Sequence, residues 1–564
     1  MAEVSLLSVG SRARWGAAPL LCVLPLVLAC APKRNATPAA LTPLAADRPR
    51  TALTVLLTID QLRADFPLRM LPRFGPGGFR RLYEEGVVYQ ASYAHSATET
   101  AVGHATLSTG ALPRDHGIVG NEWSERDARV YAVEDAAAEV LGGSADNKGK
   151  SAARLLAETL GDVLLDAQPT ALARSVSGKE RAAILLGGHK ATSYWLDSGL
   201  GTFVTSRYFV EREPAWVAAF AAQRPAERYR GQRWELMASG ATYVAVDDHP
   251  WEQHGGGVLG NVFPHSLGDV TGEQYVHALK STPFGDELTL SFVRAMFDAG
   301  PLGRHRVPDL LTLSLSSTDY VGHGFGPESR EAEDNLLRLD RTLAQLFALL
   351  DERVGKGHYV LVLSADHGAC ESPEWFTSQG RDAGRVDAEL LRRTVDEGLR
   401  ARFGVGVELV TDFVNPSLVL HEQRIASLSL ELAEVEHAAA ELALKVPGVY
   451  SAHARSDLLA GTGPDSPFKL RMEQSTHGER SGHVYIVPKE HWLLATRGEH
   501  LTAMHGTPWP YDAQVPIIVW GTGASAQRVQ RAVDPRDIAP TLAQLLGIAR
   551  PSSSSGKVLT EALP

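Results

Sequence analysis

The sequence predicts an α/β fold in which a doubly wound, mostly parallel sheet is flanked by helices. The 564 residues are 44% hydrophobic and 21% charged, which is ordinary for a chain with a substantial buried core. Short apolar runs rich in Val, Ile and Leu recur along the chain, as in strands that are buried on both faces of a parallel sheet. An amphipathic helical pattern separates two of these runs, and strands that alternate with helices are typical of a doubly wound sheet.

The predicted strands begin with the run TALTVLLTID, which ends at Asp60. Similar apolar runs follow at residues 182–186, 310–315, 359–363 and 515–520. Between the second and third of these four, leucines spaced by three and four residues predict an amphipathic helix: Leu336, Leu339, Leu343, Leu346 and Leu350.

A self-contained pattern between about Phe403 and Arg455 predicts an insertion into this sheet. It contains the strand-like segments VELV and SLVL, a helix near residues 431–445 and the segment VYSAHAR. We therefore expect a catalytic domain over residues 51–560 with an inserted α+β cap at about residues 371–480.

The first residues of the chain predict export. Two arginines precede an uncharged apolar run from Trp15 to Ala29, which suits an export signal and is shorter than the ~20 residues of a membrane-spanning helix. The run ends in LVLAC, which resembles the lipobox of bacterial lipoproteins with Cys30 as the lipidated residue; a plain signal peptide that is cut later is the alternative. We expect a signal peptide over residues 1–29 and a lipid-anchored or flexible tether over residues 30–50. The protein would then be a periplasmic or outer-membrane lipoprotein, or a secreted soluble protein.

Charge and cysteine content exclude some partners and bonds. The formal net charge is −11 and the sequence has no long basic run, so we expect no nucleic-acid partner. Of the three cysteines, Cys22 and Cys30 lie in the predicted signal region, which leaves Cys370 alone in the expected catalytic domain. No disulfide can therefore form within that domain.

Aspartates and histidines gather directly after the predicted strands. Ligands of open α/β sheets bind at the carboxyl ends of the strands, so these positions indicate a site. Asp319 and His323 are four residues apart, which places them on one face of a helical turn. The candidate ligands are Asp60, Asp319, His323, Asp366, His367 and His505.

Three carboxylates and three imidazoles suit zinc better than magnesium or calcium. Taken singly, each of these residues is more commonly a helix cap, a turn residue or a buried polar group. Their shared position after successive strands favours a metal site.

Two further segments offer a nucleophile and cations. Thr98 and Thr100 precede a helix-compatible stretch that ends near Gly110, and a hydroxyl at a helix N-terminus can meet a phosphoryl group; a threonine N-cap is the alternative. Lys179 and Arg181 stand two residues apart at the entry of the predicted strand 182–186, so both side chains would share one face. They suit the oxygens of a phosphate dianion, or they are a solvated strand end.

Seven ordered segments resemble the alkaline phosphatase superfamily, and within it the phosphate-irrepressible alkaline phosphatase type, which is related to the type I phosphodiesterases and nucleotide pyrophosphatases. The resemblance extends from about Leu53 to Ile548, over nearly all of the expected mature chain. The segments are LTIDQLRADF, TAVGHATLSTG, HGIVGNEW, GKER, SSTDYVGHGFGPES, SADHG and HGTPWPYDAQVPII.

The resemblance implies an alkaline phosphatase-like fold with two zinc ions. The first zinc would be held by Asp319, His323 and His505. The second would be held by Asp60, Asp366 and His367, with the nucleophile Thr100 bridging to it.

The resemblance also selects Thr100 over Thr98 as the nucleophile. It implies that Asn121 donates to a phosphoryl oxygen and that Lys179 and Arg181 recognise the phosphate monoester. Four more residues in or near the motifs are expected to be structural or to contact ligand residues, and not to bind zinc: His104, His116, His189 and Cys370.

The function implied is that of an exported zinc-dependent phosphate monoesterase, which hydrolyses small phosphomonoesters through a phosphothreonine intermediate. A phosphodiesterase or nucleotide pyrophosphatase of the same superfamily is the first alternative, although such enzymes lack the paired cations of GKER. A non-catalytic metal-binding surface lipoprotein is the second. A sulfatase is excluded because TAVGH offers neither the Cys or Ser nor the Arg that a sulfatase needs.

Overall fold

The computed structural model describes residues 51–125, 128–145, 147–252, 257–495 and 501–564. The predicted signal peptide and tether lie outside the described residues. Among the helices that are described, none combines the length and the apolar character needed to cross a membrane.

The centre of the fold is a ten-stranded sheet. In spatial order its strands are β20 (Gln527–Val533), β2 (Val87–Ser92), β19 (Gln514–Trp520), β12 (Tyr359–Ser364), β1 (Leu53–Ile59), β11 (Asp309–Leu315), β6 (Ala173–Ser177), β7 (Thr192–Asp197), β8 (Thr202–Ser206) and β5 (Val140–Leu141). The five strands from β12 to β7 run parallel, whereas β19 and β8 run antiparallel to their neighbours. The predicted α/β class is confirmed, with a mixed sheet whose central strands are parallel.

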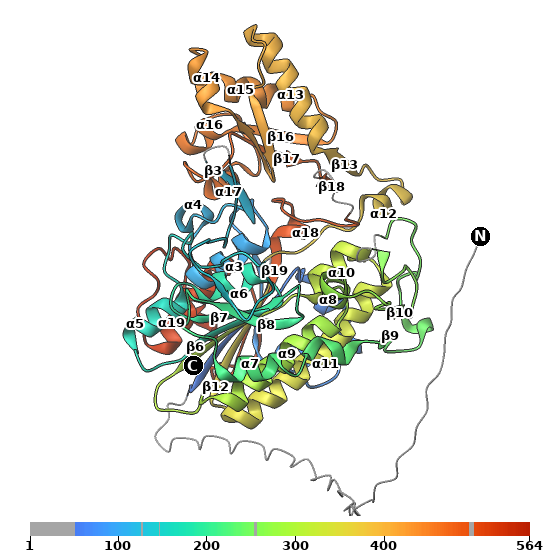
Figure 1. The fold of residues 1–564 in the computed structure, drawn as a ribbon, viewed down its shortest axis with the longest axis vertical. Helices are drawn as coiled ribbons and strands as arrows, with labels where there is room; N and C mark the ends of the chain where they lie inside the picture. Colours follow the sequence, from blue (N-terminus) through green and yellow to red (C-terminus); the bar gives the residue numbers. More distant parts are fainter. Residues whose placement is uncertain (1–50, 126–127, 146, 253–256, 496–500) are drawn as a thin grey trace, which may run out of the picture. The chain divides into compact units, whose positions relative to one another are not determined.

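Helices cover both faces of this sheet, as Figure 1 shows. Consecutive residues of β7 pack in different apolar clusters. Trp195 packs with Val102 and Ile184, while Tyr194 packs with Phe292. Residues 386–494 are called the inserted segment below, and the helices outside it are α1 (Asp65–Met70), α2 (Phe79–Glu85), α3 (Thr100–Thr109), α4 (Pro113–His116), α5 (Leu160–Ala167), α6 (Glu180–Gly187), α7 (Ala215–Ala221), α8 (Gly272–Lys280), α9 (Phe284–Ala299), α10 (Ser317–Phe325), α11 (Arg330–Leu350), α12 (Pro373–Ser378), α18 (Pro510–Ala513) and α19 (Ile538–Leu546).

The predicted strands at residues 310–315 and 359–363 are β11 and β12, and the predicted leucine helix is α11. The prediction of a strand at residues 182–186 is wrong, because these residues lie in α6. All five side chains are fully buried, since α6 packs against strands on one side and α3 on the other. A short run that is apolar on every side does not distinguish a buried strand from a buried helix. The strand that precedes it is β6, which the sequence pattern missed.

The run at residues 515–520 forms β19, a buried strand as predicted, but it is antiparallel to β12 and β2. Its direction matters for the site. The segment before an antiparallel strand lies at the same edge as the segments after its parallel neighbours. His505, which precedes β19, is therefore brought to the carboxyl ends of β1, β11 and β12.

A further apolar cluster spans Val386 to Leu494. It belongs to a four-stranded antiparallel sheet of β14 (Val410–Val414), β15 (Ser417–Leu420), β17 (Val484–Pro488) and β16 (Val449–Ala454). The helices of this part are α13 (Ala388–Phe403), α14 (Glu422–Ser427), α15 (Leu432–Ala443), α16 (Arg455–Ala460) and α17 (Lys469–Ser475). Three further pairs of short strands are β3 (Glu122–Glu125) with β4 (Ala128–Tyr131), β9 (Arg233–Trp234) with β10 (His265–Ser266), and β13 (Gly384–Asp387) with β18 (Trp492–Ala495).

The segments predicted within this part are present with one shift. SLVL is β15, VYSAHAR contains β16, and the helix expected near residues 431–445 is α15. VELV covers residues 407–410, and only its last residue lies in a strand, since β14 starts at Val410. The boundaries of the cap stay a prediction.

Helix α3 approaches the loop after β12 very closely, and Gly103 makes this possible. A Cβ atom at residue 103 would lie 2.2 Å from the carbonyl oxygen of Asp366. The glycine is therefore required by a backbone contact and not by its conformational freedom, because it sits inside a regular helix.

Replacing Gly103 by Ala should destabilise the protein by about 1–3 kcal/mol, because α3 must move away from the Asp366 loop. The sign is informative, since Gly→Ala inside a helix otherwise stabilises by roughly 0.5–1 kcal/mol. Denaturant unfolding measures the change. Gly406→Ala is the control, because a Cβ atom there would have no neighbour within 4 Å. A Gly103→Ala protein that is as stable as the wild type would contradict the close contact.

Candidate active site

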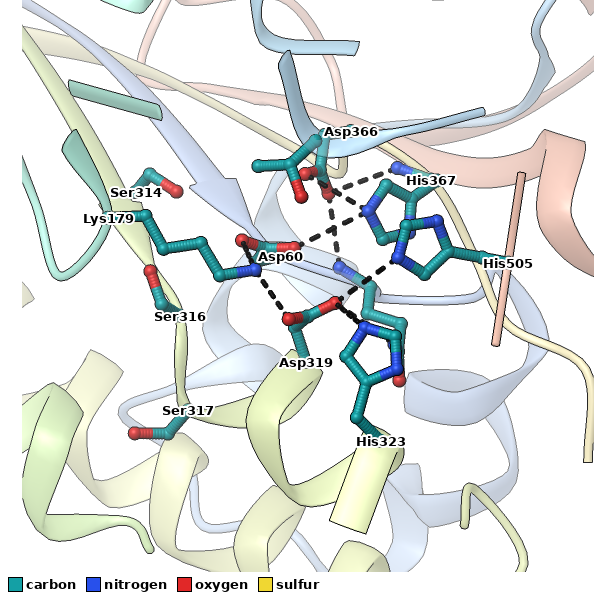
Figure 2. A network of polar contacts seen from close by, with 12 residues as sticks. Asp60, Lys179, Ser314, Ser316, Ser317, Asp319, His323, Asp366, His367 and His505 are labelled. Carbon is teal, nitrogen blue, oxygen red and sulfur yellow. Dashed lines mark hydrogen bonds and ion pairs between the residues drawn. The ribbon is translucent and has the colours of Figure 1, made fainter. Parts of the chain in front are cut away.

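The central strands bring three carboxylates to one edge of the sheet. β1 and β11 are paired so that Ile59 lies opposite Leu315 at their carboxyl ends. Asp60 follows β1 directly, Asp319 lies in the first turn of α10 after β11, and Asp366 follows β12. Segments far apart in the sequence therefore meet at one place, which Figure 2 shows from close by.

One group of side chains converges on Asp319. His323 Nε2 lies 3.2 Å from Asp319 Oδ1, and His505 Nε2 lies 3.6 Å from the same oxygen. Ligand atoms of Asp319, His367 and His505 also lie within 4.8 Å of one another, which is close enough for one metal ion. Both histidines that the resemblance implies for the first zinc thus face Asp319 Oδ1, although the group close enough for one ion contains His367 in place of His323.

A second group surrounds His367. Its Nε2 atom lies 3.5 Å from Asp60 Oδ1 and 3.4 Å from Asp366 Oδ2. The ligand atoms of these three residues also lie within 4.8 Å of one another. The rings of His367 and His505 stack with their centroids 3.5 Å apart, so the two groups are direct neighbours.

The other ring nitrogen of each histidine is tied to the backbone. Because a carbonyl oxygen can only accept a hydrogen bond, each Nδ1 atom carries a proton, and in the neutral form of each ring the lone pair of Nε2 faces the carboxylates. Metal-binding histidines are typically held in this way. The three bonds run from His323 to the Ala503 oxygen at 2.8 Å, from His367 to the Gly368 oxygen at 2.9 Å and from His505 to the Thr98 oxygen at 2.7 Å.

The buried atoms of the site fit a cation. Among the residues that the structure describes, Asp60 Oδ1 and His367 Nε2 are buried without a hydrogen-bond partner. Burial, together with the carboxylates of Asp319 and Asp366, raises the pKa of Asp60 well above its ordinary value. Buried oxygens of like charge repel each other unless a positive charge lies between them. Two carboxylates with one imidazole, beside one carboxylate with two imidazoles, match zinc by donor type.

Lys179 supplies one positive charge within this cluster. Its ammonium lies 2.7 Å from Asp60 Oδ2 and contacts Asp319 Oδ2, and its side chain is 1% exposed. Burial opposes the charge on Lys179, but the two carboxylates outweigh it and raise the pKa of the ammonium above its ordinary value.

Lys179 and Arg181 stand at the start of α6 and not at the entry of a strand, which corrects the predicted strand. Arg181 lines a cavity and donates to the Tyr131 hydroxyl at 3.3 Å, whereas Lys179 reaches the carboxylates.

A cavity of about 720 Å³ opens over the site. His323 and His505 line it together with Asn121 and Arg181. Other lining residues come from α13, β14 and the turn after β14, and include Arg392, Asp412, Phe413 and Asn415. Two of the three residues predicted to bind the phosphoryl group therefore face one cavity together with two predicted ligands.

The predicted nucleophile begins a helix at the site. Thr100 is the first residue of α3 and is 1% exposed. Thr98, the other candidate, has a structural role: its hydroxyl donates to the Thr507 oxygen at 2.8 Å and its own carbonyl oxygen accepts from His505. The structure thus gives the two threonines different surroundings, and Thr98 links the nucleophile segment to the His505 loop.

Sequence reasoning missed Gln61, which connects the two groups. Its side-chain amide donates to Asp319 Oδ1 at 3.0 Å and its backbone N–H donates to Asp366 Oδ1 at 3.1 Å. It adopts a φ of 67°, a conformation that is rare for a residue with a side chain. No feature of the sequence signals this dihedral angle; only the position directly after Asp60 points to Gln61.

The four motif residues expected to be structural lie as follows. His104 contacts both Asp366 Oδ2 at 3.2 Å and Ser314 Oγ at 2.9 Å, so it supports a candidate ligand. His116 accepts from the Ile118 N–H and His189 contacts Asp162, both away from the carboxylate cluster. Cys370 is fully buried and lies 3.8 Å from His491 Nδ1.

The chain is similar in sequence and in fold to known proteins. A family model described as type I phosphodiesterase / nucleotide pyrophosphatase matches residues 54–508. A protein of Synechococcus elongatus named alkaline phosphatase PhoV is 35% identical over 563 residues, which cover 96% of this chain and 99% of the relative. A protein of Myroides odoratus named calcium-transporting ATPase is 34% identical over 520 residues, with 91% and 94% of the two chains covered. The crystal structure of wild-type alkaline phosphatase PafA matches with a TM-score of 0.84 and 31% identity, and covers 92% of this chain and 99% of its own.

Replacing Lys179 by Met should destabilise the metal-free protein more than the zinc-loaded protein. In the metal-free protein the change leaves Asp60 and Asp319 without their cation, and loss of one partner of a buried ion pair costs about 3–5 kcal/mol. Thermal unfolding with a chelator and with added zinc measures the two losses. Lys280→Met is the control, because Lys280 is also buried but its ammonium donates to Ser198 Oγ. Equal losses in both conditions would show that Lys179 does not offset the charge of this cluster.

Proposed function

The chain belongs to the type I phosphodiesterase / nucleotide pyrophosphatase family, and we propose that it is an exported zinc-dependent alkaline phosphatase. Its substrates would be small phosphate monoesters, which it hydrolyses to an alcohol and phosphate. The full-length similarity to PhoV and the fold shared with PafA support this activity.

The observation that carries the proposal is the arrangement of the three histidines. His323, His367 and His505 each donate from Nδ1 to a backbone carbonyl oxygen and present Nε2 to buried carboxylates. Metal-binding histidines are typically held in this way, which supports a metal site. We propose that Asp319, His323 and His505 hold one zinc ion and that Asp60, Asp366 and His367 hold the other.

When bound, the two zinc ions would supply Lewis acidity that lowers the pKa of a hydroxyl group and stabilises the negative charge on a leaving oxygen. The other parts of the reaction fall to residues of the chain. Thr100 Oγ1 would give up its proton and attack phosphorus, so that the Oγ1–P bond forms while the bond to the leaving oxygen breaks, and that oxygen takes up a proton and leaves as the alcohol. A water oxygen would then bond to phosphorus while the Oγ1–P bond breaks, and a proton from that water restores the threonine hydroxyl as phosphate leaves.

The position of Thr100 favours this role. It is the first residue of the ten-residue helix α3, where the helix dipole favours negative charge on a bound phosphoryl group. Asn121 and Arg181 line the cavity beside the candidate ligands and would donate to the non-bridging oxygens. Lys179 would assist recognition of the monoester from its place among the carboxylates.

The remaining parts of the proposal concern location and access. We propose that residues 1–29 direct export, that Cys30 attaches the protein to a membrane through a lipid, and that residues 371–480 form a cap beside the active site. Residues of α13 and of β14 that line the cavity support the last point. The protein would then act outside the cytoplasm on small molecules.

A phosphodiesterase or nucleotide pyrophosphatase activity is the main alternative, because the matching family model carries that description. Arg181 in the cavity favours the monoesterase, since a monoester carries one more negative charge than a diester. A non-catalytic metal-binding protein is the second alternative.

Replacing Thr100 by Ala should lower kcat for an aryl phosphate by roughly 10³-fold or more, because the nucleophile is lost. Zinc content, measured by atomic absorption, should stay close to that of the wild type. Thr98→Val serves as the matched control and should lose much less, since Thr98 contributes one hydrogen bond to the Thr507 carbonyl. A Thr100→Ala enzyme with a near-normal rate would remove Thr100 from the mechanism.

Purified residues 31–564 should hydrolyse an aryl phosphate monoester much faster than the matching diester, and a chelator should abolish both activities. Arg181→Ala should reduce kcat/KM for the monoester by about 100-fold and for the diester by less, because the extra charge of the monoester needs this cation. Preference for the diester would favour the phosphodiesterase, and zinc binding without hydrolysis of either ester would favour the binding protein.

A further inference from the structure

The residue before the proposed nucleophile, Glu99, is a buried carboxylate. It occupies the N-cap position of α3 and is 6% exposed. An N-cap side chain commonly accepts a hydrogen bond from the first turn of its own helix, but that of Glu99 does not. Its carboxylate is directed to other segments.

The two oxygens of Glu99 accept from two different parts of the protein. Oε2 accepts from the Asn121 backbone N–H at 2.7 Å, and Oε1 accepts from Asn415 Nδ2 at 3.1 Å. Because a carboxylate can only accept, the orientation of the Asn415 amide is fixed by this contact. Glu99 therefore connects Asn121 with the inserted segment.

Asn121 is held at a second point as well. Its Oδ1 atom accepts from the Ala101 N–H in the first turn of α3 at 2.9 Å. With Oδ1 used in this way, Nδ2 is the end of the amide that can donate to a ligand in the cavity that Asn121 lines. The direction of this donor depends on the backbone of Asn121, and that backbone is bonded to Glu99.

Asn415 lies in the turn between β14 and β15 and reaches the loop that follows His505. A Cβ atom at Gly506 would lie 3.0 Å from Asn415 Nδ2, so the two segments are in close contact. The chain from Asn415 through Glu99 to Asn121 thus begins in the inserted segment and ends at the proposed phosphoryl donor.

We propose that Glu99 is a positioning residue that couples the inserted segment to Asn121 and thereby sets the direction of the phosphoryl-binding amide. The inference rests on the proposed function for the identity of the ligand, a phosphate. Glu99 also lines the cavity, and the role proposed for it is to act through the backbone of Asn121.

Because Glu99 carries a negative charge, the direction in which its removal changes phosphate affinity tests the inference. A negative charge beside a phosphate site weakens phosphate binding by repulsion, so its removal alone would strengthen binding. Loss of a positioning contact has the opposite effect. Glu99→Gln should therefore weaken the binding of inorganic phosphate to the zinc-loaded protein about tenfold, as measured by calorimetry. Tighter binding would overturn the proposal.

A reciprocal swap identifies the contact that is responsible. In Glu99→Gln the new NH₂ group faces a donor at Asn121 or at Asn415, and in Asn415→Asp two carboxylates face each other. The double variant restores complementarity, since the amide introduced at position 99 would accept from the Asn121 N–H and donate to the carboxylate introduced at position 415. We expect phosphate affinity within about threefold of the wild type for the double variant and weaker binding for each single variant. Additive losses would overturn the coupling.

The effect of Glu99→Gln in a protein that lacks the Asn121 amide tests whether Glu99 acts through Asn121. In an Asn121→Ala protein the amide is absent, so Glu99→Gln should cause no further loss of phosphate affinity. An undiminished loss there would mean that Glu99 acts elsewhere. Glu122→Gln is the matched control, because Glu122 lines the same cavity but pairs with Arg129 at 3.5 Å. Phosphate affinity should change by less than about threefold in this control.

Two further measurements separate folding and function from positioning. Thermal unfolding shows whether each variant folds; if Glu99→Gln does not, Asn415→Ser breaks the same link from the inserted segment and should also weaken phosphate binding only when Asn121 is present. Hydrolysis of an aryl phosphate by the wild type tests the proposed function independently. A wild type that binds phosphate without hydrolysis would overturn the proposed function and leave the phosphate affinities to decide on Glu99. A wild type that does not bind phosphate would overturn the inference.

Discussion

The confinement of three buried carboxylates to one small volume is the constraint on which the rest of the site depends. Asp60, Asp319 and Asp366 lie at the ends of neighbouring strands, and Asp60 and Asp366 are completely buried. Charges without water around them are costly unless opposite charge and hydrogen-bond donors surround them. Lys179 reaches two of the carboxylates, Gln61 donates to two, and the histidines turn their basic nitrogens inward. Each of these features is a response to the same excess of negative charge.

The topology of the sheet explains why so many segments can respond at one point. Parallel strands direct the residues that follow them to a single edge, which accounts for the carboxylates. The antiparallel strand β19 contributes from its amino end instead, so the histidine loop before it arrives at that edge without a crossing of the sheet. A sheet that was parallel throughout would have required an additional crossover connection to place His505 there.

Site residues that directly follow a strand could be predicted from the sequence. Site residues whose role depends on the local backbone conformation could not. Asp60 and Asp366 could be identified because each follows an apolar run that is too regular to be a loop. The placement of Lys179 and Arg181 at the start of a helix could not, because the apolar run after them reads equally well as a strand or as a helix packed on two sides. The role of Gln61 depends on a positive φ that its side chain does not signal. A local run of apolar residues indicates that a segment is buried, whereas the direction of its side chains depends on the elements that pack against it.

The start of α3 is held from three directions before any ligand arrives. Gly103 allows the helix to lie against the Asp366 loop, Thr98 ties the preceding residues to the His505 loop, and Glu99 binds both Asn121 and the inserted segment. These contacts come from elements that also carry candidate ligands or cavity walls, so a shift of any one element would move the start of the helix. A hydroxyl at Thr100 is therefore placed by the same contacts that place the surrounding charges. Pre-organisation of this kind lowers the cost of reaching a reactive geometry, because little rearrangement is left for the bound state.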